Sequence, residues 1–161
     1  MEQFQEVRDK AKRNIQIADH MLGVTFPLVK DPKLLLAILD NLFLAYSNAI
    51  SAIIYHDRLF KKVPPFQDNF ESKFNIFKER SIITHKLDKS YLQEIQDLKD
   101  ILSEHKKSPL EFSRKDRFFI CSDNYHMKSV GINEITKYLS KAKIFIEEVD
   151  NILKKNERIF K

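Results

Sequence analysis

The residues best suited to chemistry in this chain are Arg80 and His85, which enclose the stretch Arg-Ser-Ile-Ile-Thr-His. A guanidinium group stabilises the negative charge of a phosphate, and an imidazole exchanges protons near neutral pH. Together they have the chemistry to hold an anionic group and to move a proton beside it. The structural alternative is a pair of surface cations near a helix C-terminus, where the helix dipole favours positive charge.

The pair resembles the Arg-x(4–6)-His motif of HEPN domains, which are all-α bundles that often dimerise and in many members cut RNA without a metal. The resemblance implies that Arg80 stabilises phosphate charge and that His85 exchanges protons. It also implies that His85→Ala abolishes RNA cleavage without lowering thermal stability. The motif's arginine is usually followed by a distinctive amide or acid, where this chain has Ser81, and Arg13 with His20 forms a second pair within the permitted spacing.

A second candidate site is a basic and aromatic stretch before the last predicted helix. Phe112, Phe118 and Phe119 lie among its charged residues, and such mixtures hold phosphates and stack bases. We predict that this insert contacts RNA or an acidic partner; alternatively, its aromatic rings cover the end of the bundle and its charges are solvated. The predicted contact residues are Arg114, Lys115, Arg117, Asn124, Tyr125, His126 and Lys128.

A third arrangement lies within the longest apolar stretch, where Asn41, Asn48 and Tyr55 follow one another at seven-residue spacing. Buried amides need hydrogen-bond partners, so we predict a buried polar seam that fixes helix register, with a ligand pocket as the alternative. His56 lies on the apolar side of the same stretch. We interpret it as a core histidine, because no second histidine or acid stands one helical turn away to share a metal.

Other motifs with a known chemistry do not occur in the sequence. It contains no glycine-rich phosphate loop, no His-Glu-x-x-His, no paired Glu-x-x-His and no nucleophile elbow. We therefore predict neither a metal nor a cofactor. The sequence favours a protein without enzymatic activity; the enzymatic alternative is an endoribonuclease.

The elements that position these residues follow from hydrophobic periodicity. Leu34 to Phe60 is apolar over most of its circumference and predicts a central helix. Amphipathic helices are predicted before it, from Glu2 to a stop at Gly23, and after it, from Asp68 to Thr84. A fourth helix begins at Ser90. Ser108 to Glu111 could then form a short helical turn; the period changes to two around residues 118–130, and the last helix begins near Asn133. We predict an all-α protein: one domain, 1–161, forming a five-helix antiparallel bundle with a small β-hairpin-like insert.

Composition limits the classes of partner. The net charge of +5 favours an acidic partner such as RNA, DNA or an acidic protein face. The single cysteine, Cys121, and the charged N-terminal stretch predict a reducing, cytoplasmic setting. Asp40, Asn41 and Asn48 disfavour a membrane span for the central helix, since polar groups are costly in hydrocarbon.

These observations predict a cytoplasmic binding or assembly module with a basic surface for RNA or an acidic partner. The alternatives are a HEPN-like metal-independent ribonuclease of the toxin–antitoxin type and a scaffold that forms homo-oligomers through its central or last helix. The glycine-poor composition and the run from His20 to Phe66 also resemble an archaeal family of helical proteins, and that resemblance implies no particular chemistry.

Overall fold

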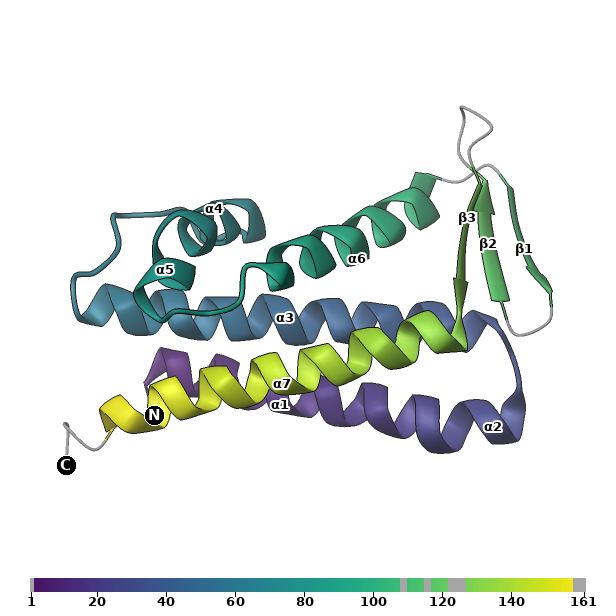
Figure 1. Ribbon diagram of the computed structural model, residues 1–161, viewed down its shortest axis with the longest axis horizontal. Coiled ribbons are helices and arrows are strands. Elements are labelled where there is room, and N and C mark those ends of the chain that lie inside the picture. Colours follow the sequence, from purple (N-terminus) through teal and green to yellow (C-terminus); the bar gives the residue numbers. More distant parts are fainter. Residues whose placement is uncertain (1, 108–109, 115–116, 122–126, 158–161) are drawn as a thin grey trace.

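The computed structural model describes residues 2–107, 110–114, 117–121 and 127–157, and the side chains of 2–106, 117–121 and 127–155 among them. Five continuous helical segments and a three-stranded sheet make up this part of the chain, which confirms the predicted helical bundle with a β insert before the last helix. The central helix separates two layers. α1 and α7 lie along one side of it, and α4, α5 and α6 lie on the other (Figure 1).

The first helical segment is longer than predicted, because it does not end at Gly23. α1 (Gln3–His20) runs into the π turn η1 (Met21–Thr25) and then α2 (Phe26–Val29). Pro27 lacks the N–H that would continue the α-helical ladder, and the wider turn before it accommodates that gap. The segment ends instead at Lys30, whose φ of 54° is left-handed and whose N–H donates to the Phe26 carbonyl.

The central helix, α3 (Lys33–Leu59), carries most of the core. Asp31 caps its first turn by accepting a hydrogen bond from the Lys33 N–H at 3.0 Å. The helix is long and apolar enough to cross a membrane, although 56% of its apolar window is buried inside the bundle, as in the core helix of a globular protein. Of its polar residues, Asp40 and Arg58 are exposed, whereas Ser51 is buried.

A broken helix returns across α3 and supplies the next layer. α4 (Phe70–Ile76) passes through a second π turn, η2 (Phe77–Ser81), into α5 (Ile82–Thr84). Lys86 then adopts a left-handed φ of 55°, and the N–H of Leu87 donates back to the Ile82 carbonyl. This six-to-one bond is the mark of a Schellman stop, so the chain turns sharply after His85.

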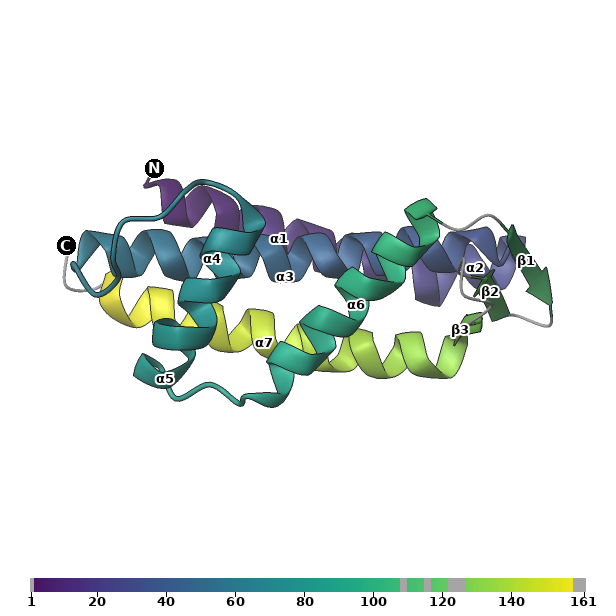
Figure 2. The ribbon, with the colours of Figure 1, turned by 90° about the horizontal axis from the view of Figure 1, so that it is seen from above.

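α6 (Ser90–Lys107) crosses α3 obliquely (Figure 2) and is joined to it by a buried pair. The Tyr46 hydroxyl donates to the Glu94 carboxylate, and the two residues are 0% and 7% exposed. Burial is the largest influence on Glu94 and raises its pKa to about 7, despite the opposing hydrogen bond from Tyr46.

The insert is a sheet of three strands in the order β1 (Leu110–Arg114), β2 (Arg117–Cys121), β3 (Met127–Gly131), with both pairings antiparallel. The predicted hairpin corresponds to β2 and β3. The first strand takes part of the stretch where a short helical turn was considered, because Leu110 to Arg114 pairs in register with β2. α7 (Ile132–Glu157) then runs back along α3.

Candidate functional site

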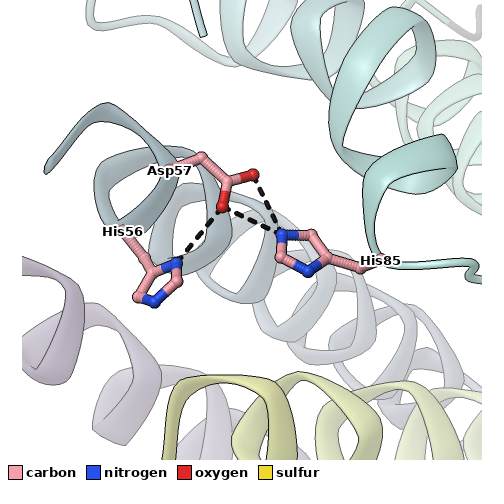
Figure 3. A group of neighbouring side chains, drawn as sticks. All are labelled: His56, Asp57 and His85. Carbon is pink, nitrogen blue, oxygen red and sulfur yellow. Dashed lines mark hydrogen bonds and ion pairs between the residues drawn. The ribbon is translucent and has the colours of Figure 1, made fainter. Parts of the chain in front are cut away.

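The polar centre of the molecule is Asp57, in the last turns of α3. Its Oδ1 lies 3.2 Å from His56 Nδ1 and 2.9 Å from His85 Nε2, and its Oδ2 accepts a hydrogen bond from the Ser81 hydroxyl at 2.8 Å. Figure 3 shows the carboxylate between the two imidazole rings, one on its own helix and one on the segment packed across it. We call these four residues the Asp57 cluster.

Two helix ends bring the cluster together. α3 stops just beyond Asp57: Lys61 adopts a left-handed φ of 56°, and the Lys62 N–H donates to the Asp57 carbonyl. On the other segment, Ser81 closes the π turn and His85 caps α5, with the His85 N–H donating to the Ser81 carbonyl. Ser81 and His85 are therefore one turn apart and face the same carboxylate.

The cluster is almost closed to water. The side chains of His56 and Asp57 are 0% and 1% exposed, and that of His85 is 9% exposed. Phe4 packs its ring edge against His56 at a centroid distance of 5.4 Å, and Phe60 lies 4.8 Å from the same ring. His85 is thus the side chain of the cluster nearest to solvent.

The carboxylate is charged despite this burial. Burial alone raises the pKa of a carboxyl group, but the hydrogen bonds from His56, His85 and Ser81, together with the electrostatic attraction of His85, outweigh it. The pKa of Asp57 therefore lies below its ordinary value. A buried anion held by these donors also fixes the orientation of His85, since its Nε2–H must point at the carboxylate.

The same three residues form a group with metal-ligand character. One ligand atom each from His56, Asp57 and His85 lies within 4.8 Å of the others. Spacing along one helix reveals only ligands that stand one turn apart on it. The structure instead supplies the acid from the adjacent position and the second imidazole from another segment.

Arg80 and His85, the predicted catalytic pair, differ in their surroundings. Arg80 is exposed on η2, whereas His85 turns inward to Asp57. Exposed cations are frequent near the cluster in the sequence, however. The exposed cations that flank the cluster in sequence, in 58–62 and 78–86, are Arg58, Lys61, Lys62, Lys78, Arg80 and Lys86. We call this group the basic end; only one exposed acid, Glu79, stands within these two ranges.

The predicted contact residues of the insert are described in part. The Arg117 side chain makes hydrogen bonds inside the protein: its Nη2 donates to the Ser129 hydroxyl at 2.8 Å and to the Glu134 carboxylate at 2.8 Å. Lys128 is exposed on β3. The backbone of Arg114 lies in β1, while its side chain and the residues Lys115, Asn124, Tyr125 and His126 lie outside the described part of the chain.

The three residues of the predicted polar seam separate into two groups. Asn48 donates to Asn14 of α1 at 2.9 Å, and Asn14 in turn lies 3.5 Å from the Asn41 oxygen, so these amides join α1 to α3. Tyr55 is 6% exposed and instead donates to Asp68 in the following connection at 2.6 Å. Seven-residue spacing does not reveal Asn14, which reaches the seam from another helix.

The sequence reasoning also missed Asp57, although a signal was present. Asp57 lies about 100° around the helix from the exposed Arg58, on the side that carries the apolar residues. An acid on the apolar side of a core helix requires buried partners. Comparison with known proteins adds no guide to this site: no family model matches the chain, and no curated protein or solved structure does either.

Proposed function

We propose that this chain is a binding module that holds single-stranded RNA at the basic end of the bundle. The observation that carries the proposal is the concentration of charge: six exposed cations and one exposed acid stand in the two short ranges that flank the Asp57 cluster. The excess equals the net charge of +5 of the whole chain. A local excess of this kind attracts a phosphate backbone and releases its counterions.

Aromatic rings at the same end favour RNA over an acidic protein. Phe60 and Phe66 are half-buried, and Lys62 and Arg58 lie over their rings at 5.6 and 5.1 Å. Rings and cations mixed in this way bind single strands, because bases stack on the rings while the cations follow the phosphates. An acidic protein surface offers no bases that could stack on these rings.

The proposal is tested by fluorescence anisotropy with a labelled single-stranded RNA of about 20 nucleotides, titrated at several salt concentrations. The informative variant combines Lys61→Gln, Arg80→Gln and Lys86→Gln. Each cation that contacts a phosphate contributes about 0.7 to the slope of log affinity against log salt, so the slope should decrease by about two.

A matched control removes the same charge from the opposite end of the bundle. Lys30, Lys33 and Lys137 are exposed near the start of α3 and in the first turns of α7 (Figure 1), and their triple Gln variant should keep the wild-type slope. Equal losses in both triple variants would contradict a localised site. If only Lys128→Gln lost RNA affinity, the RNA would contact the insert and not the basic end. If the protein bound an acidic peptide more tightly than RNA, the RNA proposal would be excluded.

A second candidate, the metal-independent ribonuclease, is favoured by one observation. His85 is oriented by a buried carboxylate, an arrangement that in other enzymes holds an imidazole in a fixed tautomer for proton transfer. Arg80, exposed five positions earlier, would then stabilise phosphate charge.

This candidate is tested by incubating RNA with the protein in the presence of a chelator. Cleavage that disappears in both Arg80→Ala and His85→Gln, with folding intact, supports it. RNA that stays whole with the wild-type protein excludes it, and leaves the binding proposal unaffected because binding is measured separately.

A further inference from the structure

We propose that His56, Asp57 and His85 bind one divalent transition-metal ion of the zinc type, which joins the end of α3 to the end of α5. This inference is independent of RNA binding, since its ligands are buried and the proposed RNA contacts are exposed cations. Its basis is the geometry, charge and ligand chemistry of the Asp57 cluster.

The ligand atoms already stand near the spacing that an ion requires. Zinc lies about 2.0–2.2 Å from nitrogen and oxygen ligands, which places two ligands of a tetrahedral site about 3.3–3.5 Å apart. The two imidazole nitrogens lie 3.2 and 2.9 Å from Asp57 Oδ1, and all three ligand atoms lie within 4.8 Å of one another. Binding of the ion would widen the two nitrogen–oxygen distances by a few tenths of an ångström and bring the three ligand atoms toward equal spacing.

The negative charge of the buried Asp57 carboxylate also favours a bound cation. Asp57 is 1% exposed, and its three hydrogen-bonding partners are two imidazoles and a hydroxyl. A buried carboxylate is costly in a protein interior unless opposite charge and hydrogen-bond donors compensate it, and an ion bound to Asp57 would add such a charge. The basic end does not neutralise this carboxylate at close range, because its salt-bridge partners are His56 and His85.

The kind of ligand selects the kind of metal. Two imidazole nitrogens and one carboxylate oxygen suit zinc and its neighbours, while magnesium and calcium prefer oxygen ligands alone. The Ser81 hydroxyl, 2.8 Å from Asp57 Oδ2, holds the second carboxylate oxygen and so orients the ligand. A fourth ligand, a water molecule, would enter from the His85 side, which is the more exposed one.

Such an ion would act as a structural link. Asp57 and His85 are 28 positions apart, and the segment that carries His85 packs across the end of the central helix (Figure 3). Because the ion would bind the folded chain more tightly than the unfolded chain, it would stabilise the packing of α4 and α5 against α3. The tight enclosure leaves little room for a substrate at the ion.

The test uses the full chain without a histidine tag, stripped with a chelator and dialysed. Cobalt(II) is added as a spectroscopic probe, because tetrahedral coordination gives strong visible absorption, and zinc is then added to displace it. We expect saturation at one equivalent of cobalt. An excess of zinc near 100 times its dissociation constant should raise the melting temperature by about 5–10 °C.

Three variants separate this site from surface binding. His85→Gln keeps a hydrogen-bond donor for Asp57 and should weaken metal binding at least tenfold, as should Asp57→Asn. His20→Gln, at an exposed histidine of α1, should bind as the wild type does. Magnesium at the same concentration should leave the melting temperature unchanged.

The result that overturns the proposal comes from the wild-type protein alone, so it does not depend on whether a variant folds. If the stripped protein gives no tetrahedral cobalt spectrum and no zinc-dependent rise in melting temperature, the cluster is a hydrogen-bonded network without a metal. Equal loss of binding in His20→Gln would likewise assign the ion to surface histidines.

Discussion

His85 Nε2 lies 2.9 Å from Oδ1 of Asp57, although the two residues are 28 positions apart and belong to different helical segments. The contact makes one residue of the predicted catalytic pair a structural partner of a buried carboxylate. Arg80, the other residue of the pair, stays exposed. A substitution at His85 therefore affects the folded state as well as any chemistry.

We predict that His85→Ala destabilises the protein, contrary to the sequence-based expectation of unchanged stability. The substitution leaves the buried Asp57 carboxylate with one donor fewer, which costs about 1–3 kcal/mol of unfolding free energy. His85→Gln, whose amide can donate from a similar position, should restore most of that loss. Urea denaturation of the three proteins measures it, and an unchanged midpoint for His85→Ala would contradict the contact.

How far the sequence predicts this molecule depends on whether the partners are local. Periodicity predicted the central helix and the β insert, because both depend on residues close along the chain. The Asp57 cluster depends on a long-range contact between two helix ends, and the Asn14 bonds to Asn41 and Asn48 on the packing of α1 against α3. Spacing within one helix carries no information about either.

Gly23 and Gly131 show why helix and strand boundaries were harder to predict than the elements themselves. Gly23 was expected to end the first helix, but it lies inside the π turn, and the helical segment continues through α2, which contains Pro27. Gly131 ends β3, where its N–H donates to the Glu134 carboxylate at 3.1 Å. A glycine allows a helix or strand to end but does not require it. The tertiary contacts around the glycine determine whether the element ends there.

Stability should fall as pH rises from about 5 to 8, because of Glu94. Its pKa is about 7 in the folded protein and 4.5 as the ordinary value, so the folded state favours the protonated carboxyl group. The stabilisation is complete below the lower value and is lost as pH rises through the higher one, by at most about 3 kcal/mol. Urea denaturation at pH 5, 6.5 and 8 measures the loss.

Glu94→Gln is the control for this pH dependence, since its amide oxygen can still accept from the Tyr46 hydroxyl. The variant should lose the fall in stability between pH 5 and 8. A wild-type protein that is equally stable at pH 5 and pH 8 would show that ionisation of Glu94 does not destabilise the folded state. Asp57 does not interfere, because its lowered pKa makes its own contribution disappear only as pH falls below about 4.

Lys61→Gly should stabilise the protein. Lys61 adopts a φ of 56° at the end of α3, a left-handed conformation that costs a non-glycine residue about 1 kcal/mol or more. Part of the gain is offset by the greater freedom of glycine in the unfolded chain, so we expect about 0.5–1 kcal/mol, or roughly 1–4 °C in melting temperature. Lys61→Ala keeps the strained conformation and should give no such gain; a gain of equal size would assign the effect to the lost charge.

The two glycines of the chain should respond to alanine with opposite signs. A Cβ added at Gly23 meets nothing within 4 Å, and the residue is exposed within a helical segment, so Gly23→Ala should stabilise by about 0.5–1 kcal/mol. A Cβ at Gly131 would lie 2.6 Å from Arg117 Nη1 and 2.9 Å from Glu134 Oε2. Gly131→Ala must therefore displace the ion pair that joins β2 to α7, and should destabilise by about 1 kcal/mol. Melting curves of both variants decide the signs; a Gly131→Ala protein as stable as the wild type would show that the pair shifts aside without loss.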